Sequence, residues 1–172
     1  ETSGNGQGFL GQVCHNWEAE AEKAAAKGAR VVRMRFGVVL GRGGGAMATM
    51  ELPFKLGLGG PIGSGQQWFP WIHFDDLVAA ALFLLSAEDC HGPFNFTAPQ
   101  PVRQKEFARQ LGAVLHRPAF LPAPAFIMKT LLGEFGASLL QGQKVIPQAL
   151  TDSGYLFTYP CLYEALTKIP GA

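Results

Sequence analysis

Residues 9–36 read FLGQVCHNWEAEAEKAAAKGARVVRMRF, and this stretch decides the fold class. Apolar side chains recur every four positions from Phe9 onward, which predicts a helix over residues 9–27. Gly28 ends this helix, and the β-branched content of residues 30–36 predicts a strand. A helix, a glycine and a strand in this order form the αβ half of a βαβ unit, so the sequence predicts an α/β protein.

The rest of the chain alternates strand and helix patterns up to residue 116. From Arg117 onward prolines and glycines interrupt the pattern, so we divide the chain into residues 1–116 and a small α-rich C-terminal segment, residues 117–172. The further predicted elements are a turn over 37–45, a helix over 46–56, a strand over 66–74, a helix over 76–87 capped by Asp75, a strand over 94–97, an amphipathic helix over 103–116, helices over 125–132 and 147–152, a strand over 155–158 and a helix over 162–168.

Composition excludes several function classes. Apolar residues are 48% of the chain, charged residues are 16% and the formal net charge is +1, so no basic surface for nucleic acid is predicted. The longest apolar run, residues 77–86, is about half the length of a membrane span. Cys14, Cys90 and Cys161 are far apart, and with the four histidines they show no metal-ligand spacing. We expect a reducing compartment, the cytoplasm, with an organelle as the alternative.

Residues 57–74 combine glycine and aromatic side chains in one run. Five glycines in nine residues leave the backbone open to close approach, and bulky aromatic side chains follow at once. This pattern predicts the wall of a small-molecule pocket; the alternative is a loop leading into a buried strand. The predicted wall residues are Gly59, Gly60, Trp68, Phe69 and Trp71.

A second glycine cluster, residues 41–45, follows the predicted strand over residues 30–36. Its backbone amides are suited to an anion, with Arg42 assisting and Lys55 adding positive charge. The alternatives are a plain turn for the glycines and solvated surface positions for the two cations.

Two motifs carry a resemblance to a known family. Residues 35–41, RFGVVLG, resemble the strand-and-turn segment that extended short-chain dehydrogenases write as RpgnvyGp, and residues 71–77, WIHFDDL, resemble their later v-h-v-D-D-v segment. The blocks GRGGGAM, PFKLGLGGPIGSGQQWFPWIH and GPFNFTAP and the tail from HRPAFLPAPAF to GYLFTYP are more specific. Over residues 9–166 the chain is similar to the carboxyl-terminal half of the atypical epimerase-like branch of this superfamily, the epimerase family proteins with their own C-terminal domain of unknown function.

The resemblance implies the carboxyl-terminal part of a Rossmann-type, doubly wound parallel sheet with substrate-loop insertions. It implies NADP as the cofactor, with NAD as the alternative, and places most of the cofactor-binding half before Glu1. The positions beside the nicotinamide would be Phe36, Gly37, Val38 and Val39. Gly37 lets the backbone come close and Val38 offers an amide to the carboxamide, while a plain turn is the alternative. The partner implied is a small-molecule substrate, and a homodimer is left open.

One departure from the family concerns the catalytic pair YxxxK on the helix before this strand. Cys14 occupies the tyrosine position and Glu18 the lysine position. A carboxylate one turn away disfavours a thiolate, so this pair cannot do what tyrosine and lysine do. Glu18 could still accept hydrogen bonds from ribose hydroxyls, and the alternative for Cys14 is a small buried core residue.

A second departure concerns the substrate. Nucleotide-sugar members carry an arginine that grips a diphosphate, where this chain has the aromatic run 68–71. The sequence therefore favours a less charged substrate than a nucleotide sugar. His73 is the remaining candidate for proton transfer, and its alternative is a hydrogen-bonded structural histidine beside the cap at Asp75.

These features predict an NADP-dependent oxidoreductase or epimerase-like protein that acts on a small substrate. The displaced Tyr-Lys pair keeps a second hypothesis open, an NADP-binding sensor or scaffold without turnover.

Overall fold

The computed structural model describes residues 1, 6, 8–123 and 142–169. In chain order its helices and strands are α1 (Phe9–Ala25), β1 (Val32–Phe36), β2 (Val38–Leu40), α2 (Gly45–Lys55), β3 (Trp68–Phe69), β4 (Trp71–His73), α3 (Phe74–Ser86), β5 (Gly92–Phe96), β6 (Val102–Arg103), α4 (Gln104–Val114), α6 (Gln148–Asp152) and α7 (Leu162–Thr167). The helix expected over residues 125–132 lies outside the described residues.

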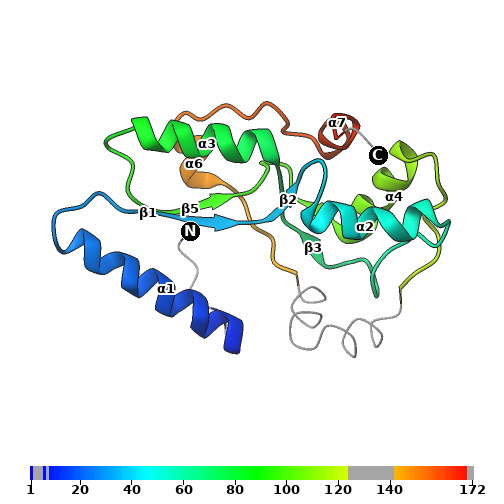
Figure 1. The fold of residues 1–172 in the computed structure, drawn as a ribbon, viewed down its shortest axis with the longest axis horizontal. Helices are drawn as coiled ribbons and strands as arrows, with labels where there is room; N and C mark the ends of the chain where they lie inside the picture. The colour runs from blue at the N-terminus through cyan, green and yellow to red at the C-terminus, as the bar shows by residue number, and fades with distance from the viewer. Residues whose placement is uncertain (2–5, 7, 124–141, 170–172) are drawn as a thin grey trace.

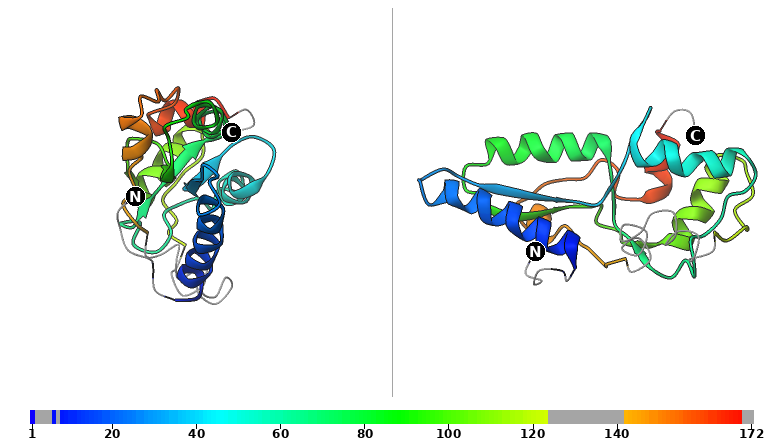
Figure 2. Two further views of the ribbon diagram at one scale, coloured as in Figure 1. Left: turned by 90° about the vertical axis from the view of Figure 1, so that its left-hand side faces the viewer. Right: turned by 60° about the horizontal axis from the view of Figure 1, so that its bottom comes forward.

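A parallel strand pair between two helices forms one half of the molecule. β1 pairs with β5 in parallel, from Val32 opposite Gly92 to Phe36 opposite Phe96. Figure 1 shows α1 on one side of this pair and α3 on the other, and both views in Figure 2 keep them apart. Helices on both faces of parallel strands define a doubly wound α/β arrangement, so the predicted fold class is confirmed.

Two further strand pairs form the other half. β2 pairs in parallel with β4, and β3 pairs antiparallel with β6. α2 and α4 lie on this side of the molecule in Figure 1, with α7 close to the end of the chain. Each half has its own apolar core. One core is built around Leu40, Trp71 and Leu111, and the other around Ile72, Leu84 and Phe96.

Helix α1 and strand β1 form as the sequence predicts, because Gly28 adopts φ +87° and ends the helix there. Three other predictions need correction. The turn over residues 37–45 contains strand β2, and the strand over residues 66–74 is divided at Pro70 into β3 and β4. Proline has no N–H to donate to a ladder, which explains the division. Residues 155–158 form no strand.

Helix α3 begins two residues earlier than predicted, at Phe74, and its cap is His73 rather than Asp75. Nδ1 of His73 accepts the amide of Asp75 at 3.2 Å. Asp75 and Asp76 then occupy the first turn, where a negative charge meets the positive end of the helix dipole.

The carboxylate of Asp76 ties α3 to the C-terminal segment. It is fully buried and accepts the Tyr155 hydroxyl at 3.1 Å and the amides of Thr158 and Tyr159 at 2.8 Å each. Burial raises the pKa of Tyr155, so this phenol keeps its proton to donate. The amides of Thr158 and Tyr159 need no strand partner, since the carboxylate oxygens of Asp76 accept both.

The described part of residues 117–172 packs on both cores: Leu150 of α6 joins that of β5, and Leu162 and Leu166 of α7 join that of α4. The boundary at 116/117 stays a prediction.

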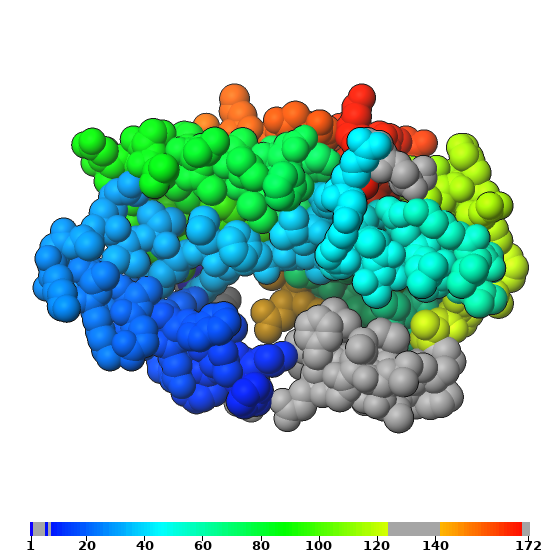
Figure 3. All heavy atoms as spheres, in the orientation of Figure 1, coloured from blue at the N-terminus to red at the C-terminus, as the bar shows by residue number. Residues whose placement is uncertain are grey.

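The outer side of α1 carries uncovered apolar side chains. None of its residues is buried, and Trp17 is 72% exposed. Figure 3 shows this side, with a hollow bordered by α1, by β1 and by the orange atoms of residues that follow Gly142.

We predict that Asp76→Asn lowers the free energy of unfolding by about 2–3 kcal/mol, because a buried amide cannot replace a carboxylate that accepts three donors. Urea unfolding followed by circular dichroism measures this change. The matched control is Asp75→Asn on the same helical turn, where the side chain is 65% exposed and the expected change is about 0.5 kcal/mol or less. Equal effects of the two substitutions would contradict this role of Asp76.

Candidate functional site

The carboxyl ends of β1 and β5 meet the amino ends of β2 and β4 at Gly37. Its amide donates to the carbonyl of Phe96 at 3.1 Å, and the next amide, that of Val38, donates to the carbonyl of Pro70 at 2.8 Å. A Cβ at Gly37 would lie 2.8 Å from the Pro70 oxygen and 3.0 Å from Cγ2 of Thr97. Glycine is therefore required by the crossing of these segments. Open α/β sheets bind ligands at this edge.

The four residues predicted to contact the cofactor differ in which backbone and side-chain groups are free to bind it. The amide of Val38 is already bonded within the chain, so the expectation that it serves a carboxamide needs correction. Val39 is half-buried against the core of α3. Phe36 is 55% exposed, with its ring edge-on to Phe96 at a centroid distance of 5.5 Å. The ring of Phe36 is thus the open apolar surface at this strand end.

Glu18, at the position of the family's lysine, forms an ion pair that joins α1 to β1. Its two carboxylate oxygens accept from Nε and Nη2 of Arg35 at 2.6 and 2.7 Å, and Nη1 of Arg33 lies 3.6 Å away. The hydrogen bonds from Arg35 hold the pKa of Glu18 below its ordinary value. A carboxylate engaged in this way is a weak proton acceptor, and it holds α1 to β1. The ribose contact considered from sequence stays a prediction.

Cys14 lies on the same helix one turn earlier, and it is exposed. The alternative of a small buried core residue is therefore wrong for this thiol. Arg35 interacts electrostatically with Cys14, but its guanidinium is engaged in two hydrogen bonds by the carboxylate of Glu18, which opposes activation of the thiol as a nucleophile.

His73 has the geometry of a hydrogen-bonded structural histidine, which is the alternative considered from sequence. It is 5% exposed, caps α3 through Nδ1 and packs its ring on Tyr159 at a centroid distance of 4.1 Å. Burial holds the pKa of His73 below its ordinary value, against the opposing effect of Asp75 and Asp76. A neutral imidazole with one nitrogen committed to a cap is poorly placed for proton transfer.

The predicted pocket wall is in large part core packing. Trp71 is 1% exposed, so its side chain cannot wall an open pocket, and this prediction needs correction. Phe69 packs on Phe107 at a centroid distance of 4.2 Å. Gly59 and Gly60 leave room for neighbouring parts of the chain: a Cβ would lie 2.3 Å from the Phe54 ring at the first and 2.0 Å from the Leu121 oxygen at the second. The glycines serve close internal contacts.

Among the residues of the predicted wall, Trp68 has two positively charged side chains over its ring. Cζ of Arg103 lies 3.5 Å from its ring centroid, and Nζ of Lys144 lies 5.3 Å from it. Sequence reasoning missed both cations, because they come from β6 and from the segment before α6. No local pattern signals a contact between residues so distant in sequence.

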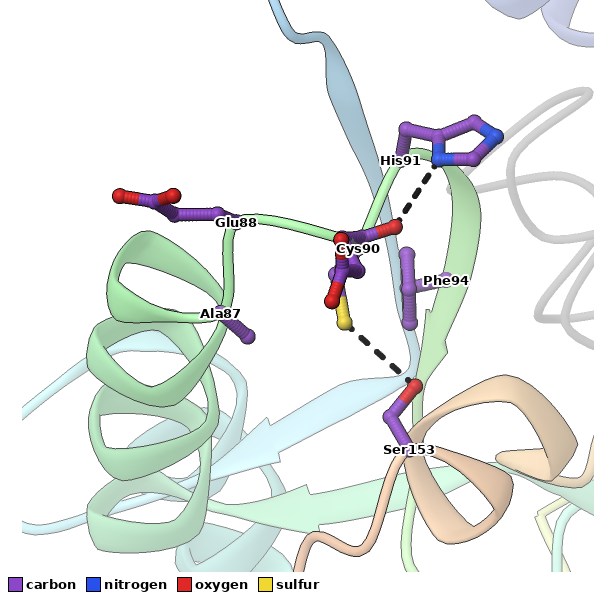
Figure 4. A pocket seen from close by; sticks show the side chains of 7 residues that line it. Ala87, Glu88, Cys90, His91, Phe94 and Ser153 are labelled. Carbon is purple, nitrogen blue, oxygen red and sulfur yellow. Dashed lines mark hydrogen bonds between the residues drawn. The ribbon is translucent and has the colours of Figure 1, made fainter.

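Two shallow cavities lie away from this strand end. One, of about 420 Å³, lies at the amino end of β5, where Cys90 Sγ is 3.5 Å from Ser153 Oγ (Figure 4). The other, of about 330 Å³, lies between residues 41–43 and α2 and brings together Arg42 and Lys55, the cations considered for the glycine cluster. Its wall also holds the buried carboxylate of Glu51, paired with Lys55 at 2.5 Å, which opposes binding of an anion.

Metal-binding clusters and membrane-spanning helices are both absent from the described ranges. No cluster of three or more His, Cys, Asp or Glu side chains suited to a metal ion occurs in them. None of the helices described has the length and apolar character needed to cross a bilayer.

Comparison with known proteins places these features in a family. Residues 123–169 match the family described as Domain of unknown function (DUF1731). The chain is 48% identical over 169 residues to the epimerase family protein SDR39U1 homolog, chloroplastic, of Arabidopsis thaliana, covering 98% of this chain and 48% of that protein. The chain thus spans about half the length of that relative.

Solved structures agree in fold. The crystal structure of human epimerase family protein SDR39U1 (isoform 2) with NADPH superposes with a TM-score of 0.89 at 44% identity, covering 98% of this chain and 57% of that chain. UDP-glucose 4-epimerase from Thermotoga maritima, with UDP-glucose, shares the fold at 18% identity and a TM-score of 0.65, covering 89% of this chain and 49% of that chain.

The parallel strands, the helices on both faces and the strand-end crossing at Gly37 define part of a Rossmann-type α/β protein of the short-chain dehydrogenase type. More narrowly, the chain matches the carboxyl-terminal part of the epimerase family proteins.

We predict that Glu18→Gln lowers the free energy of unfolding by about 1 kcal/mol at pH 7, because it removes a partly exposed bidentate ion pair. The folded-state pKa of Glu18 is lowered, so this stability is present above the ordinary value of 4.5 and is lost as the pH falls through the folded value. Chemical unfolding at several pH values tests this. Glu20→Gln, 69% exposed on the same helix, is the control with little effect, and a pH-independent difference for Glu18→Gln would refute the assignment.

For His73 we predict a titration midpoint below its ordinary pKa of 6.5, followed by the imidazole signals in NMR spectra. Tyr159→Ala uncovers the ring, so its midpoint should move up toward 6.5 as solvation of the charged form is restored. A midpoint above 6.5 in the unsubstituted protein would show that the two carboxylates outweigh burial, and would return His73 to the list of proton donors.

Proposed function

We propose that this chain contributes the nicotinamide-side and substrate-side parts of an NADP(H)-dependent epimerase-family enzyme. The observation that carries the proposal is the open ring of Phe36 at the carboxyl end of β1, in a fold shared with a human relative solved with NADPH. Because the chain spans about half the length of its relatives, the activity of a whole protein enters here as a proposal.

The residues at the strand end fit a planar ring. Phe36 offers an uncovered aromatic surface, and Gly37 adds no side chain beside it. The amide of Val38 makes no contribution, because it is committed to Pro70. Phe36 and the backbone at Gly37 would therefore hold the nicotinamide end of NADP(H). When bound, this cofactor donates or accepts a hydride.

The uncovered side of the molecule supports this arrangement. β1 has β5 as its neighbour on one edge only among the described strands, and Met34 on this strand is 45% exposed. Trp17 of α1 is exposed on the adjoining helix. We propose that a further strand and its helix, from the part of the relatives that this chain does not include, cover this side and complete the cofactor site.

The proposed substrate is a small molecule other than a nucleotide sugar. Phe69 occupies the strand position next to Trp68 and packs on Phe107, so no arginine fork stands there to grip a diphosphate. Positive charge near this point comes from single contacts on Trp68. One charged group on the substrate is thus better matched than two adjacent phosphates.

A second candidate function, an NADP-binding sensor or scaffold without turnover, rests on a specific observation. Each of the three candidate catalytic groups lacks a setting for proton transfer: Glu18 is ion-paired, His73 is buried as a helix cap, and Arg35, the cation that interacts with Cys14, is engaged by Glu18. NADPH oxidation by a panel of small carbonyl compounds separates the two candidates. Turnover of any of them supports the enzyme, and binding without turnover across the panel supports the sensor.

We predict that Phe36→Ala in the full-length protein weakens NADPH binding about fivefold to tenfold, because it removes an aromatic surface at the strand end. Isothermal titration calorimetry measures the affinity. The matched control is Met34→Ala, two residues earlier on the same face of β1, for which we expect no change beyond twofold. Unchanged NADPH affinity in Phe36→Ala would remove the basis for placing the nicotinamide there.

A further inference from the structure

We propose that Arg103 and Lys144, gathered on the ring of Trp68, form a binding site for one oxyanion, the carboxylate or phosphate group of a small substrate. The role of this site in binding a substrate rests on the function proposed above. Anion binding itself can be measured whether or not that function is correct.

Two cations share one aromatic ring in this site. Cζ of Arg103 is 3.5 Å and Nζ of Lys144 is 5.3 Å from the centroid of Trp68, so the two charges are less than about 9 Å apart. Each is attracted by the negative face of the ring. They also repel each other, since both are positive and the described residues place no carboxylate in an ion pair with either of them.

Neither cation has an acidic partner among the described residues. The ion pairs of that part of the chain involve other cations: Lys23, Arg33, Arg35, Lys55, His73 and Arg109. The carboxylate nearest in sequence, Glu106, is engaged by Arg109 and Gln110 instead. The two charges on Trp68 are thus available to a ligand.

The guanidinium of Arg103 is already held in place. Its Nη1 donates to the carbonyl of Gln66, and its plane rests on the indole. Nε and Nη2 keep N–H groups for which the described residues provide no acceptor. A planar fork fixed on one side is preorganised to donate to an oxyanion on the other, since little side-chain freedom remains to be lost.

The segment that carries Lys144 is held against β3 by Gly142. A Cβ at Gly142 would lie 2.3 Å from the Trp68 oxygen and 2.8 Å from the Trp68 nitrogen. This close backbone contact sets Lys144, two residues later, beside the ring. The lysine end is still exposed, which suits a group that closes on a ligand entering from solvent.

The position of Trp68 connects this site to the proposed reaction centre. β3 is followed by Pro70, whose carbonyl accepts the amide of Val38 at 2.8 Å, at the strand end where Phe36 presents its ring. An oxyanion on Trp68 would thus anchor one end of a small molecule whose other end extends toward that strand end. A compact carboxylate or phosphate monoester matches two single cations better than a diphosphate does.

The test is an NMR titration of the full-length protein with inorganic phosphate and, separately, with acetate, following the indole N–H signal of Trp68. We expect saturable shifts with one of the two probes, which identifies the preferred oxyanion. Arg103→Gln and Lys144→Gln should each weaken its affinity about tenfold, and Lys144→Arg should retain most of it. The matched control is Lys105→Gln, which removes an exposed charge next to Arg103 without a recorded contact to Trp68, and should change affinity by less than twofold.

NADPH affinity of each variant is measured in parallel, so that the two proposals fail separately. If Arg103→Gln and Lys144→Gln still bind NADPH and also bind the oxyanion with unchanged affinity, the proposed oxyanion site is wrong and the proposed cofactor function is not affected. An equal loss in Lys105→Gln would also overturn the oxyanion site, as a general effect of net charge. Prevention of phosphate and acetate binding by saturating NADPH would assign the cations to the cofactor and overturn the substrate site. Oxyanion binding that persists when NADPH does not bind would support the site and refute the proposed cofactor function.

Discussion

The crossing at Gly37 joins the two halves of this molecule, because the amide of Gly37 donates to the carbonyl of Phe96 in β5 and the next amide, that of Val38, donates to the carbonyl of Pro70 between β3 and β4. It forms because Gly37 carries no side chain, so that β1 can run into β2 while the segments of Pro70 and Thr97 pass within contact distance. The amide of Ala98 donates to the carbonyl of Trp71 at 2.6 Å beside it. Both cores and the candidate site depend on this crossing, because it brings the carboxyl ends of β1 and β5 to the amino ends of β2 and β4. A side chain at position 37 would separate them.

Several residues that have the chemistry of catalysts are used for structure. Glu18 holds α1 to β1 through Arg35, His73 caps α3, and Asp76 fastens the C-terminal segment to that helix. Each is a polar group that is buried or paired, and a group committed to such bonds has less freedom to exchange protons with a ligand. The positions at which the resemblance places a tyrosine and a lysine on the first helix thus hold Cys14 and an ion-paired Glu18, and the open ring of Phe36 is the feature of this strand end proposed to contact a cofactor.

Charge at the substrate side is supplied in a different way from the arginine fork of nucleotide-sugar enzymes. The aromatic run that replaces the fork puts Trp71 into the core and stacks Phe69 on Phe107. Trp68 then collects Arg103 and Lys144 from two other segments. The aromatic residue Trp68 thus provides a surface on which two cations distant in sequence lie. The substrate with a single anionic group that we propose is less charged than a nucleotide sugar, in line with the sequence prediction.

The sequence by itself determined the α/β class, the helix that Gly28 ends, the apolar helix after Asp75 and the family motif at residues 35–41, because these depend on local periodicity, backbone freedom and short motifs. It did not determine β2, since three residues among glycines carry too little pattern, nor the division of a strand at Pro70, where the carbonyl bonded to Val38 lies. The pairing of Glu18 with Arg35, the burial of Trp71 and the approach of Lys144 to Trp68 were decided by tertiary structure alone. Their physical reason is common to all three: each depends on segments that only the completed fold brings within a few ångströms.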